Sequence, residues 1–257
     1  MKVQLLPSTF DGDGASSRQH LTCFVINDSV AVDAGSLAQS CSERQRQNVR
    51  DIVLTHAHLD HIAGLPLFID DLFSTLDSPI RIHACEDVIE VLERHIFNWS
   101  VYPRFSELKN SRGPVVEYEP LVTGMESRVR DLTFLPVRVN HKVPGSGFLI
   151  SDENSCIGFS GDTSVMDEFW SAVNRCERLS ALLIECAFPS GLQELADVSH
   201  HLTPQKLRTE LEKFGHQDTP VYVINMKPMF RDQIVREVEA LQMKNLNVFD
   251  AGRPYEF

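Results

Sequence analysis

The amino-acid sequence predicts an α+β fold, namely a four-layer αββα sandwich in which two β-sheets are stacked between two layers of helices. Each half of the chain begins with strand-like segments and continues with helical segments, so each half supplies one sheet and one helical layer. The 257 residues, of which 42% are hydrophobic, are enough to enclose a large core. We therefore expect a single domain over residues 1–257.

Strand signals dominate the first third of the chain. Two apolar and β-branched runs, 21–26 and 29–33, flank Asn27-Asp28, a pair that favours the tight turn of a hairpin. The expected strands of this part are 3–6, 21–26, 29–33, 52–54 and 81–84.

Helices and one long loop follow these strands. We expect helices over 62–73 and 87–97, and in the second of them apolar residues recur at helical spacing. The stretch 99–120 contains three prolines and one glycine, so we expect a long loop or lid there. It is not expected to be a linker, because the strands that follow need the first half of the chain to pack against.

The last part of the chain alternates strands with helices. Thr203 is a good N-cap and Pro204 fits a first helical turn, so a helix is expected to begin there and to end at Gly215. A further helix is expected over 232–243, with its apolar residues on one face. The expected strands of the second half are 132–139, 147–150, 156–160, 181–185 and 221–224.

Composition and charge argue against several classes of protein. The net charge of −12 and the dispersed lysines and arginines disfavour a nucleic-acid-binding face. The chain has no run of 18 apolar residues, and the apolar part of its N-terminus is too short for a signal peptide, so we expect neither a membrane span nor secretion. Six scattered cysteines without a Cys-x-x-Cys pair favour reduced thiols and a cytoplasmic location.

The most informative motif combines three imidazoles and one carboxylate within six residues. It contains His56, His58, Asp60 and His61, directly after the expected strand 52–54. The cluster therefore lies on a strand-to-helix loop, where the backbone can aim several donors at one point. Imidazole nitrogens and carboxylate oxygens are ligands that zinc accepts, so the motif predicts a metal site.

Two further candidate ligands follow expected strands in the second half. His141 follows the strand that ends near residue 139, and Asp162 follows Gly161 at the end of another strand. A carboxylate can bridge two cations, because each oxygen can serve one of them. Two cations about 3.5–4 Å apart can share a water and lower its pKa to about 7. Such a site suits hydrolysis of a phosphodiester, a lactam, a lactone or a thioester.

These motifs resemble a known superfamily. The pattern His56-x-His58-x-Asp60-His61, followed by His141 and by Ser160-Gly161-Asp162-Thr163, is similar to that of the metallo-β-lactamase fold superfamily. The resemblance implies an αββα sandwich of the metallo-β-lactamase type with metals at one edge. Further segments resemble the class II cyclic-nucleotide phosphodiesterases and their ribonuclease Z relatives, namely 95–99, 102–105, 185–188 and 196–204.

The resemblance also implies a ligand set. His56, His58 and His141 would hold one metal, Asp60 and His61 would hold a second, and Asp162 would bridge the two. A metal-bound hydroxide would attack the cyclic phosphorus and release a 5′-nucleotide. Asp60 and His201 are the expected catalytic residues, His201 through proton transfer, although a loop histidine without a role is an equal alternative. The expected cofactor is Zn²⁺, as one or two ions.

One position departs from the family pattern. Where the family has His-x-Lys-Pro, this chain reads Asn225-Met226-Lys227-Pro228. An amide oxygen is a poor zinc ligand beside imidazole, so three outcomes stay open. The second ion is bound weakly, or it is a harder cation such as Mn²⁺ (Fe²⁺ being a further alternative), or Asn225 contacts the substrate and the site works with one metal. His200 is a candidate replacement ligand.

Three residues are expected to wall the nucleotide pocket, namely His95, Asn98 and Trp99. Trp99 would stack on a base, or it would belong to the core instead. The leading function is a metal-dependent phosphodiesterase acting on 3′,5′-cyclic nucleotides such as cAMP or cGMP. The alternatives are a tRNA 3′-processing nuclease of the ribonuclease Z type and a degenerate nucleotide- or metal-binding protein; lactamase activity ranks last. The expected partner is a small cyclic nucleotide, with no nucleic acid and no membrane, and a homodimer stays open.

Overall fold

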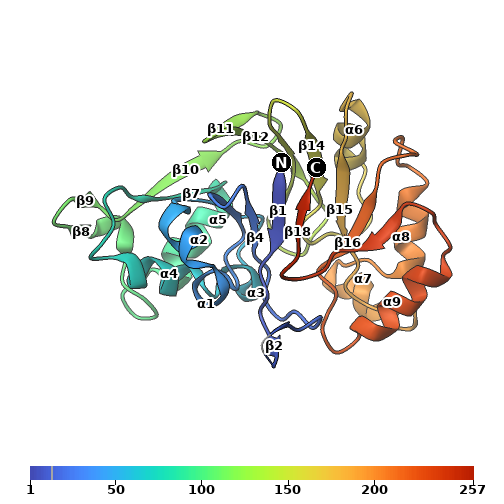
Figure 1. Cartoon of the computed structure of the whole chain (residues 1–257), viewed down its shortest axis with the longest axis horizontal. Coiled ribbons are helices and arrows are strands. Elements are labelled where there is room, and N and C mark those ends of the chain that lie inside the picture. The colour runs from blue at the N-terminus through green and yellow to red at the C-terminus, as the bar shows by residue number, and fades with distance from the viewer. Residues whose placement is uncertain (13) are drawn as a thin grey trace.

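Two seven-stranded β-sheets form the centre of the structure, and helices cover their outer faces (Figure 1). The computed structural model describes residues 1–12 and 14–257. In Figure 1 the helices of the first half, in blue and cyan, lie on one side of the strands, and those of the second half, in orange and red, lie on the other. The layers match the predicted αββα sandwich.

The first sheet is built mainly from the first half of the chain. Its central strands β5 and β6 pair in parallel, whereas the hairpin of β4 and β5 is antiparallel, as the Asn27-Asp28 turn predicts. The C-terminal strand pairs with the N-terminal one, which brings both ends of the chain together. In spatial order the strands are β10 (Val116–Leu121), β7 (Ile80–Cys85), β6 (Asp51–Val53), β5 (Val30–Val32), β4 (Phe24–Ile26), β1 (Lys2–Leu5) and β18 (Pro254–Glu256).

The second sheet follows the same plan in the second half. Four of its strands, β14 to β17, are parallel, and the other neighbours are antiparallel. In spatial order they are β11 (Ser127–Val129), β12 (Leu132–Arg138), β13 (Ser146–Ser151), β14 (Cys156–Phe159), β15 (Ala181–Glu185), β16 (Val221–Ile224) and β17 (Leu246–Val248). Two small hairpins, β2–β3 (Phe10–Asp11 and Gly14–Ala15) and β8–β9 (Lys109–Asn110 and Gly113–Pro114), lie outside both sheets.

The helices are short and pack on the outer faces of the sheets. Those of the first half are α1 (Leu37–Ser40), α2 (Glu43–Asn48), α3 (Leu59–Ile62), α4 (Leu65–Leu72) and α5 (Glu86–Val91), which continues as a π-helical turn over Leu92–Ile96. Those of the second half are α6 (Glu168–Arg175), α7 (Gln193–Ser199), α8 (Pro204–Leu211) and α9 (Arg231–Ala240). Short 3-10 turns cover Phe105–Glu107 and Ser190–Leu192.

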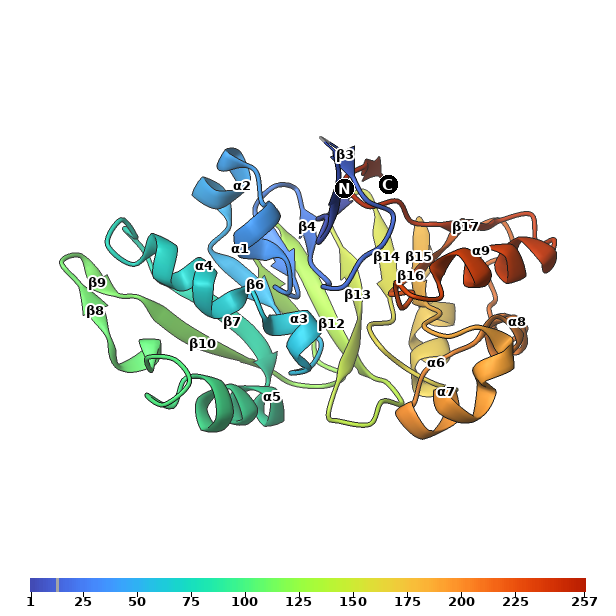
Figure 2. The same ribbon diagram turned by 90° about the horizontal axis from the view of Figure 1, so that it is seen from below.

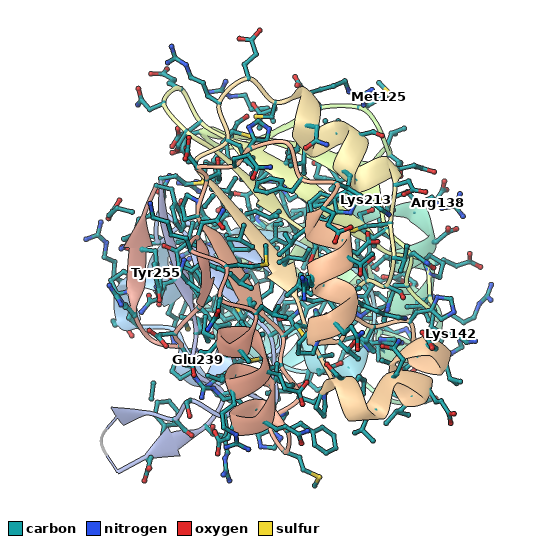
Figure 3. All side chains as sticks on the ribbon, turned by 90° about the vertical axis from the view of Figure 1, so that its right-hand side faces the viewer. Met125, Arg138, Lys142, Lys213, Glu239 and Tyr255 are labelled. Atoms are coloured by element: carbon teal, nitrogen blue, oxygen red, sulfur yellow. The ribbon has the colours of Figure 1, made fainter. Side chains whose placement is uncertain are left out.

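The alternation of side chains along the strands explains the layers. In β5, Val30 and Val32 belong to the core between the two sheets, together with Phe148 and Phe159 of the second sheet. Ala31 points to the opposite face and packs with the helices of the first half. Because side chains alternate along a strand, one short apolar run fills two cores. Charged residues on the outside, such as Arg138 and Lys142, point into solvent (Figure 3).

Three predicted elements are corrected by the structure. The stretch 99–120 is not a loop throughout, because residues 116–121 form β10, which pairs with β7 alone and therefore tolerates Pro120 at the edge of the sheet. The predicted helix 62–73 begins later, as α4, because Ile62 is the last residue of α3 and the chain breaks at Gly64, where a Cβ atom would lie 2.6 Å from the carbonyl oxygen of Ala34. Residues 21–23 precede β4 instead of extending it.

The strands are arranged so that many of them end at one edge of the sandwich. Strands β5 and β6 of the first sheet are parallel, and so are β14, β15 and β16 of the second. The loops after the two sets meet, because Nε2 of His56, after β6, lies 3.9 Å from Oδ2 of Asp162, after β14. Figure 2 shows α3 where the two halves of the molecule adjoin. The residues that follow these strand ends are therefore brought together.

Candidate metal centre

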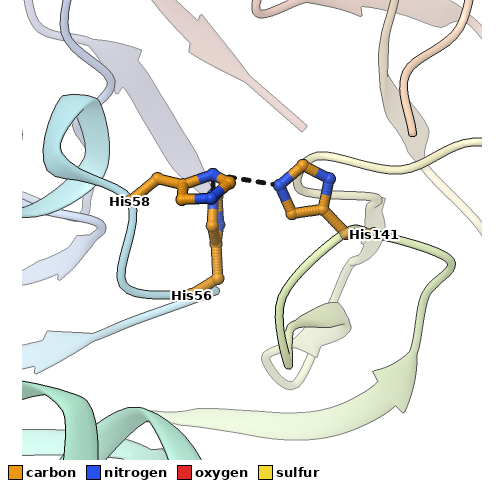
Figure 4. A group of neighbouring side chains, drawn as sticks. All are labelled: His56, His58 and His141. Atoms are coloured by element: carbon orange, nitrogen blue, oxygen red, sulfur yellow. Dashed lines mark hydrogen bonds between the residues drawn. The ribbon is translucent and has the colours of Figure 1, made fainter. Parts of the chain in front are cut away.

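Three imidazoles converge at this edge. The Nδ1 atom of His58 lies 3.0 Å from Nε2 of His56 and 3.1 Å from Nε2 of His141 (Figure 4). His56 and His58 come from the loop between β6 and α3, whereas His141 follows β12 and lies 83 residues further along the chain than His58. The structure thus brings together the three residues that the family resemblance implied as one ligand set.

Hydrogen bonds behind the rings fix which nitrogens are free to bind a cation. The hydroxyl of Thr55 donates to Asp33 and accepts from Nδ1 of His56 over 2.9 Å, so Nε2 of His56 carries a lone pair. Nδ1 of His141 donates to the carbonyl oxygen of His200 over 3.3 Å, which leaves a lone pair on its Nε2 as well. His58 can donate a proton to at most one of these two nitrogens. Three facing ring nitrogens with at most one shared proton fit a cation at their centre.

The protonation of these rings favours the same role. Burial lowers the pKa of His56 well below its usual value and also lowers the pKa of His58. Burial lowers the pKa of His141 to about 4. All three rings are therefore neutral at physiological pH, and neutral imidazole is the form that binds metal ions.

Asp162 adds a carboxylate to this group. Its Oδ2 atom lies 3.4 Å from Nε2 of His61 and 3.9 Å from Nε2 of His56, and the side chain is buried. Gly161 presents it in a left-handed turn (φ +60°), where an added Cβ atom would lie 3.2 Å from the carbonyl oxygen of Ser146. Burial opposes ionisation of Asp162, but the charge and the hydrogen bond of His61 hold its pKa well below the usual range.

Asp33 holds His61 in place from behind, and sequence reasoning missed it. Its buried carboxylate accepts from Nδ1 of His61 over 2.6 Å and from the backbone nitrogen of Thr55 over 2.8 Å. This leaves Nε2 of His61 to face Asp162. The signal was present, because Asp33 follows β5 just as Asp162 follows β14, and β5 runs parallel to β6.

Glu185 supports His201 in the same way. The fully buried carboxylate of Glu185 accepts from Nδ1 of His201 over 2.8 Å, so Nε2 of the imidazole is left for the site. One ligand atom of His201 lies within 4.8 Å of those of His141 and Asp162. Burial lowers the pKa of His201, but the adjacent charge and hydrogen bond of Glu185 outweigh this and raise it. Glu185 was singled out in the sequence only as part of a motif.

The opposite side of the group is occupied by nitrogen donors. Nδ2 of Asn225 donates to Oδ1 of Asp162 over 2.7 Å, and Nζ of Lys227 donates to Oδ2 of Asp60 over 3.1 Å. A cavity of about 220 Å³ adjoins these residues and is also lined by His61. His200 does not replace the missing ligand, because its Nδ1 faces Oδ1 of Asn140 at 3.0 Å and only its backbone carbonyl reaches His141.

The three residues expected to wall a nucleotide pocket lie elsewhere. Among the described residues, His95, Asn98 and Trp99 do not line the cavity beside Lys227. The side chain of Asn98 is engaged locally, because its oxygen accepts from the backbone nitrogens of Ser100 and Val101. Trp99 is 56% exposed, so it is not part of the core. A substrate-binding role for these three residues stays a prediction.

The donor set can hold a divalent cation. His56, His58 and His141 would bind it, with Asp162 as an additional ligand, and neutral nitrogens with one carboxylate suit a metal that activates water. Beside them, His61 and Asp162 lie within ligand distance of His56, whereas Asp60, which was expected to join His61 on a second metal, is contacted by Lys227 instead. Asp162 would then contact the cation, lie near the imidazole of His201 and line the cavity, an arrangement that suits a hydrolytic site.

Comparisons with known proteins identify the family of the chain. A family model described as a Beta-lactamase superfamily domain matches residues 26–218. A probable 3′,5′-cyclic-nucleotide phosphodiesterase from Yersinia pestis is 27% identical over 287 residues, which cover 91% of this chain and 82% of the relative. A chloroplastic tRNase Z from Arabidopsis thaliana is 29% identical, but the match covers 54% of this chain and 36% of the relative.

A solved structure shows the same fold. The crystal structure of unliganded yeast PDE1 superposes with a TM-score of 0.75 over 96% of both chains, at 19% sequence identity. The chain spans about half the length of three other relatives that are named as 3′,5′-cyclic-nucleotide phosphodiesterases. The fold expected from the motifs is thus confirmed.

Proposed function

The chain belongs to the beta-lactamase superfamily and has the fold of metal-dependent hydrolases, and we propose that it is a phosphodiesterase that hydrolyses 3′,5′-cyclic nucleotides to 5′-nucleotides. The observation that carries this proposal is the convergence of His56, His58 and His141 beside Asp162. The relative from Yersinia pestis, which is matched over most of both chains, supports the choice of substrate.

Each residue of the site has its own role in the proposed reaction. A divalent cation, when bound, lowers the pKa of a water molecule and neutralises charge on phosphoryl oxygens. His56, His58, His141 and Asp162 would hold and orient that cation. His201 carries a proton that it can give to the leaving 3′ oxygen, because Glu185 raises its pKa and fixes Nδ1. Asp60 acts through Lys227, which it holds at the edge of the cavity.

The charge of the chain limits the substrate. A net charge of −12 repels a polyanion at long range, whereas the cavity offers a small anion two local cationic side chains, Lys227 and Arg231, among its carboxylates. This distribution suits a small substrate with one phosphodiester group. We propose zinc as the cation, since imidazole nitrogens dominate the ligand set.

None of the helices in residues 1–12 and 14–257 is long and apolar enough to cross a membrane. The six cysteines are all free, which supports our proposal of a cytoplasmic location.

The experiment is a product assay with purified protein. Zinc-loaded protein is incubated with cAMP and with cGMP, and the nucleotides are separated by chromatography. We expect the 5′-nucleotide as product, loss of activity with a chelator, and recovery after zinc is restored. The variant His58→Ala removes the central imidazole and is expected to lose at least about 100-fold in rate. No product from either nucleotide with zinc bound would contradict the proposal.

A tRNA 3′-processing nuclease is the second candidate. The match to a tRNase Z relative favours this candidate. That match covers 54% of this chain, however, whereas the match to the phosphodiesterase from Yersinia pestis covers 91%. The acidic charge of the chain disfavours a long polyanionic substrate. Precursor tRNA is therefore included in the same assay, and cleavage of it without turnover of cyclic nucleotides would reverse the order of the two proposals.

A further inference from the structure

The side of the metal centre formed by Asn225 and Lys227 differs from the side formed by the three imidazoles. His61 and Asp162 lie within ligand distance of His56, and Asp60 lines the cavity beside them. By its residue types this set could bind a second cation. In this chain, however, two N–H donors already contact the carboxylate oxygens that such a cation would need.

The first donor is the amide of Asn225. Its Nδ2 atom lies 2.7 Å from Oδ1 of Asp162, and its Oδ1 atom accepts from the hydroxyl of Thr22 over 3.4 Å. Rotating the amide by 180° would place its oxygen against the carboxylate oxygen, where two acceptors repel each other. The group that faces Asp162 is therefore NH₂, which cannot bind a cation. Asn225 adopts a left-handed conformation (φ +54°), which asparagine tolerates well.

The second donor is the ammonium group of Lys227. Its Nζ atom lies 3.1 Å from Oδ2 of Asp60, and its backbone nitrogen donates to the carbonyl oxygen of Ala187 over 3.1 Å. A lysine ammonium is charged at neutral pH, and the adjacent carboxylate of Asp60 favours this form. The ammonium is thus charged, fixed at both ends and half-buried at the rim of the cavity.

We propose that this site holds a single divalent cation, on the three imidazoles and Asp162, and that the amide of Asn225 takes the place of a ligand that a second one would need. The charges fit this assignment, because Lys227 neutralises Asp60 and only Asp162 remains to balance the cation. The ammonium and the amide also line the cavity where a phosphate group would lie. They would donate to phosphoryl oxygens, a role that rests on the proposed phosphodiesterase function.

The ion count can be measured without any substrate. Metal-free protein is titrated with Zn²⁺, and bound zinc is determined by elemental analysis after removal of the free ion. We expect about one tightly bound zinc per chain, and about two for Asn225→His, since the imidazole supplies a strong ligand in place of the amide. Histidine also tolerates the left-handed conformation at this position. The variant Met226→His, one residue away, serves as control and should keep the wild-type count.

Two results would overturn the inference, namely two zinc ions of similar affinity in the wild-type chain, or an unchanged count in folded Asn225→His. If Asn225→His does not fold, the wild-type titration alone decides. The variant Lys227→Gln should keep its zinc and lose about 100-fold in turnover, and unchanged turnover would overturn the role of the ammonium. A chain that binds one zinc and hydrolyses no cyclic nucleotide would contradict the proposed function but not the ion count.

Discussion

The imidazole of His61 donates its Nδ1 hydrogen to the buried carboxylate of Asp33 over 2.6 Å, although 28 residues separate the two in sequence. The same carboxylate accepts from both the backbone nitrogen and the hydroxyl of Thr55. Asp33 therefore fixes the loop that carries the first ligands and also turns Nε2 of His61 toward Asp162.

The variant Asp33→Asn tests this support. The carboxylate of Asp33 accepts three hydrogen bonds, from the backbone nitrogen and hydroxyl of Thr55 and from Nδ1 of His61. Asparagine would turn its NH₂ group toward at least one of these donors, so at least one buried hydrogen bond would be lost. We expect the free energy of unfolding to fall by about 1–3 kcal/mol and the zinc affinity to fall by about 10- to 100-fold. Thermal unfolding and zinc titration measure the two effects. The exposed Asp218→Asn is the control, and a wild-type affinity in Asp33→Asn would contradict the role of Asp33.

The pair formed by Glu185 and His201 gives a second prediction. If His201 transfers a proton and does not bind the cation, His201→Ala should lower kcat by about 100-fold and leave the bound zinc unchanged. Glu185→Gln should shift the alkaline limb of the pH–rate profile to lower pH, because the carboxylate raises the pKa of His201. Loss of zinc from His201→Ala would instead identify His201 as a ligand.

Trp99 gives a third prediction, which concerns the substrate. The ring is more than half exposed on the turn after the π-helical segment, so it is accessible to a nucleotide base. Should it stack on the base, Trp99→Ala would raise KM for cAMP about 10-fold with little change in kcat. The exposed Val101→Ala is the matched control on the same turn. A KM equal to that of the wild type would show that Trp99 does not contact the substrate.

A fourth prediction concerns acid stability far from the metal centre. The buried carboxylate of Asp51 accepts from Nε of Arg81 over 2.7 Å and from Nε2 of His83 over 3.0 Å. Burial alone would raise the pKa of Asp51, but these hydrogen bonds lower it well below its usual value. Since the folded pKa is below the unfolded value of about 4, the carboxylate stabilises the fold above that pH and loses this effect as the pH falls further.

The variant Asp51→Asn should therefore cost about 2 kcal/mol at pH 7. The difference in free energy of unfolding between this variant and the wild type should shrink as the pH is lowered below about 4. Urea unfolding at several pH values measures it. A difference that stays constant down to the acid-unfolding range would show that the ionised carboxylate is not what stabilises this part of the sheet.

Residues close in sequence made the first part of the site predictable. His56, His58, Asp60 and His61 form a local motif, and the structure places three of them with their predicted partners. The fold was predictable for a similar reason, because continuous apolar runs in segments such as 30–32 and 181–184 signal buried strands.

Contacts between distant segments limited the rest. Asp33 lies beside His61 only because β5 and β6 pair in parallel, a register that composition does not reveal. Pro120 concealed strand β10, since its edge position is a property of the whole sheet. The outcome at Asn225 depended on which end of its amide faces Asp162, and that contact links residues 63 positions apart.

The most direct test is to restore zinc stepwise to chelator-treated protein and to follow 5′-AMP formation from cAMP. We expect the rate to rise linearly and to reach its maximum at about one zinc per chain, and the same titration of His58→Ala to give at least about 100-fold less product. A fully zinc-loaded wild-type chain that forms no 5′-AMP would contradict the assignment of this centre to cyclic-nucleotide hydrolysis.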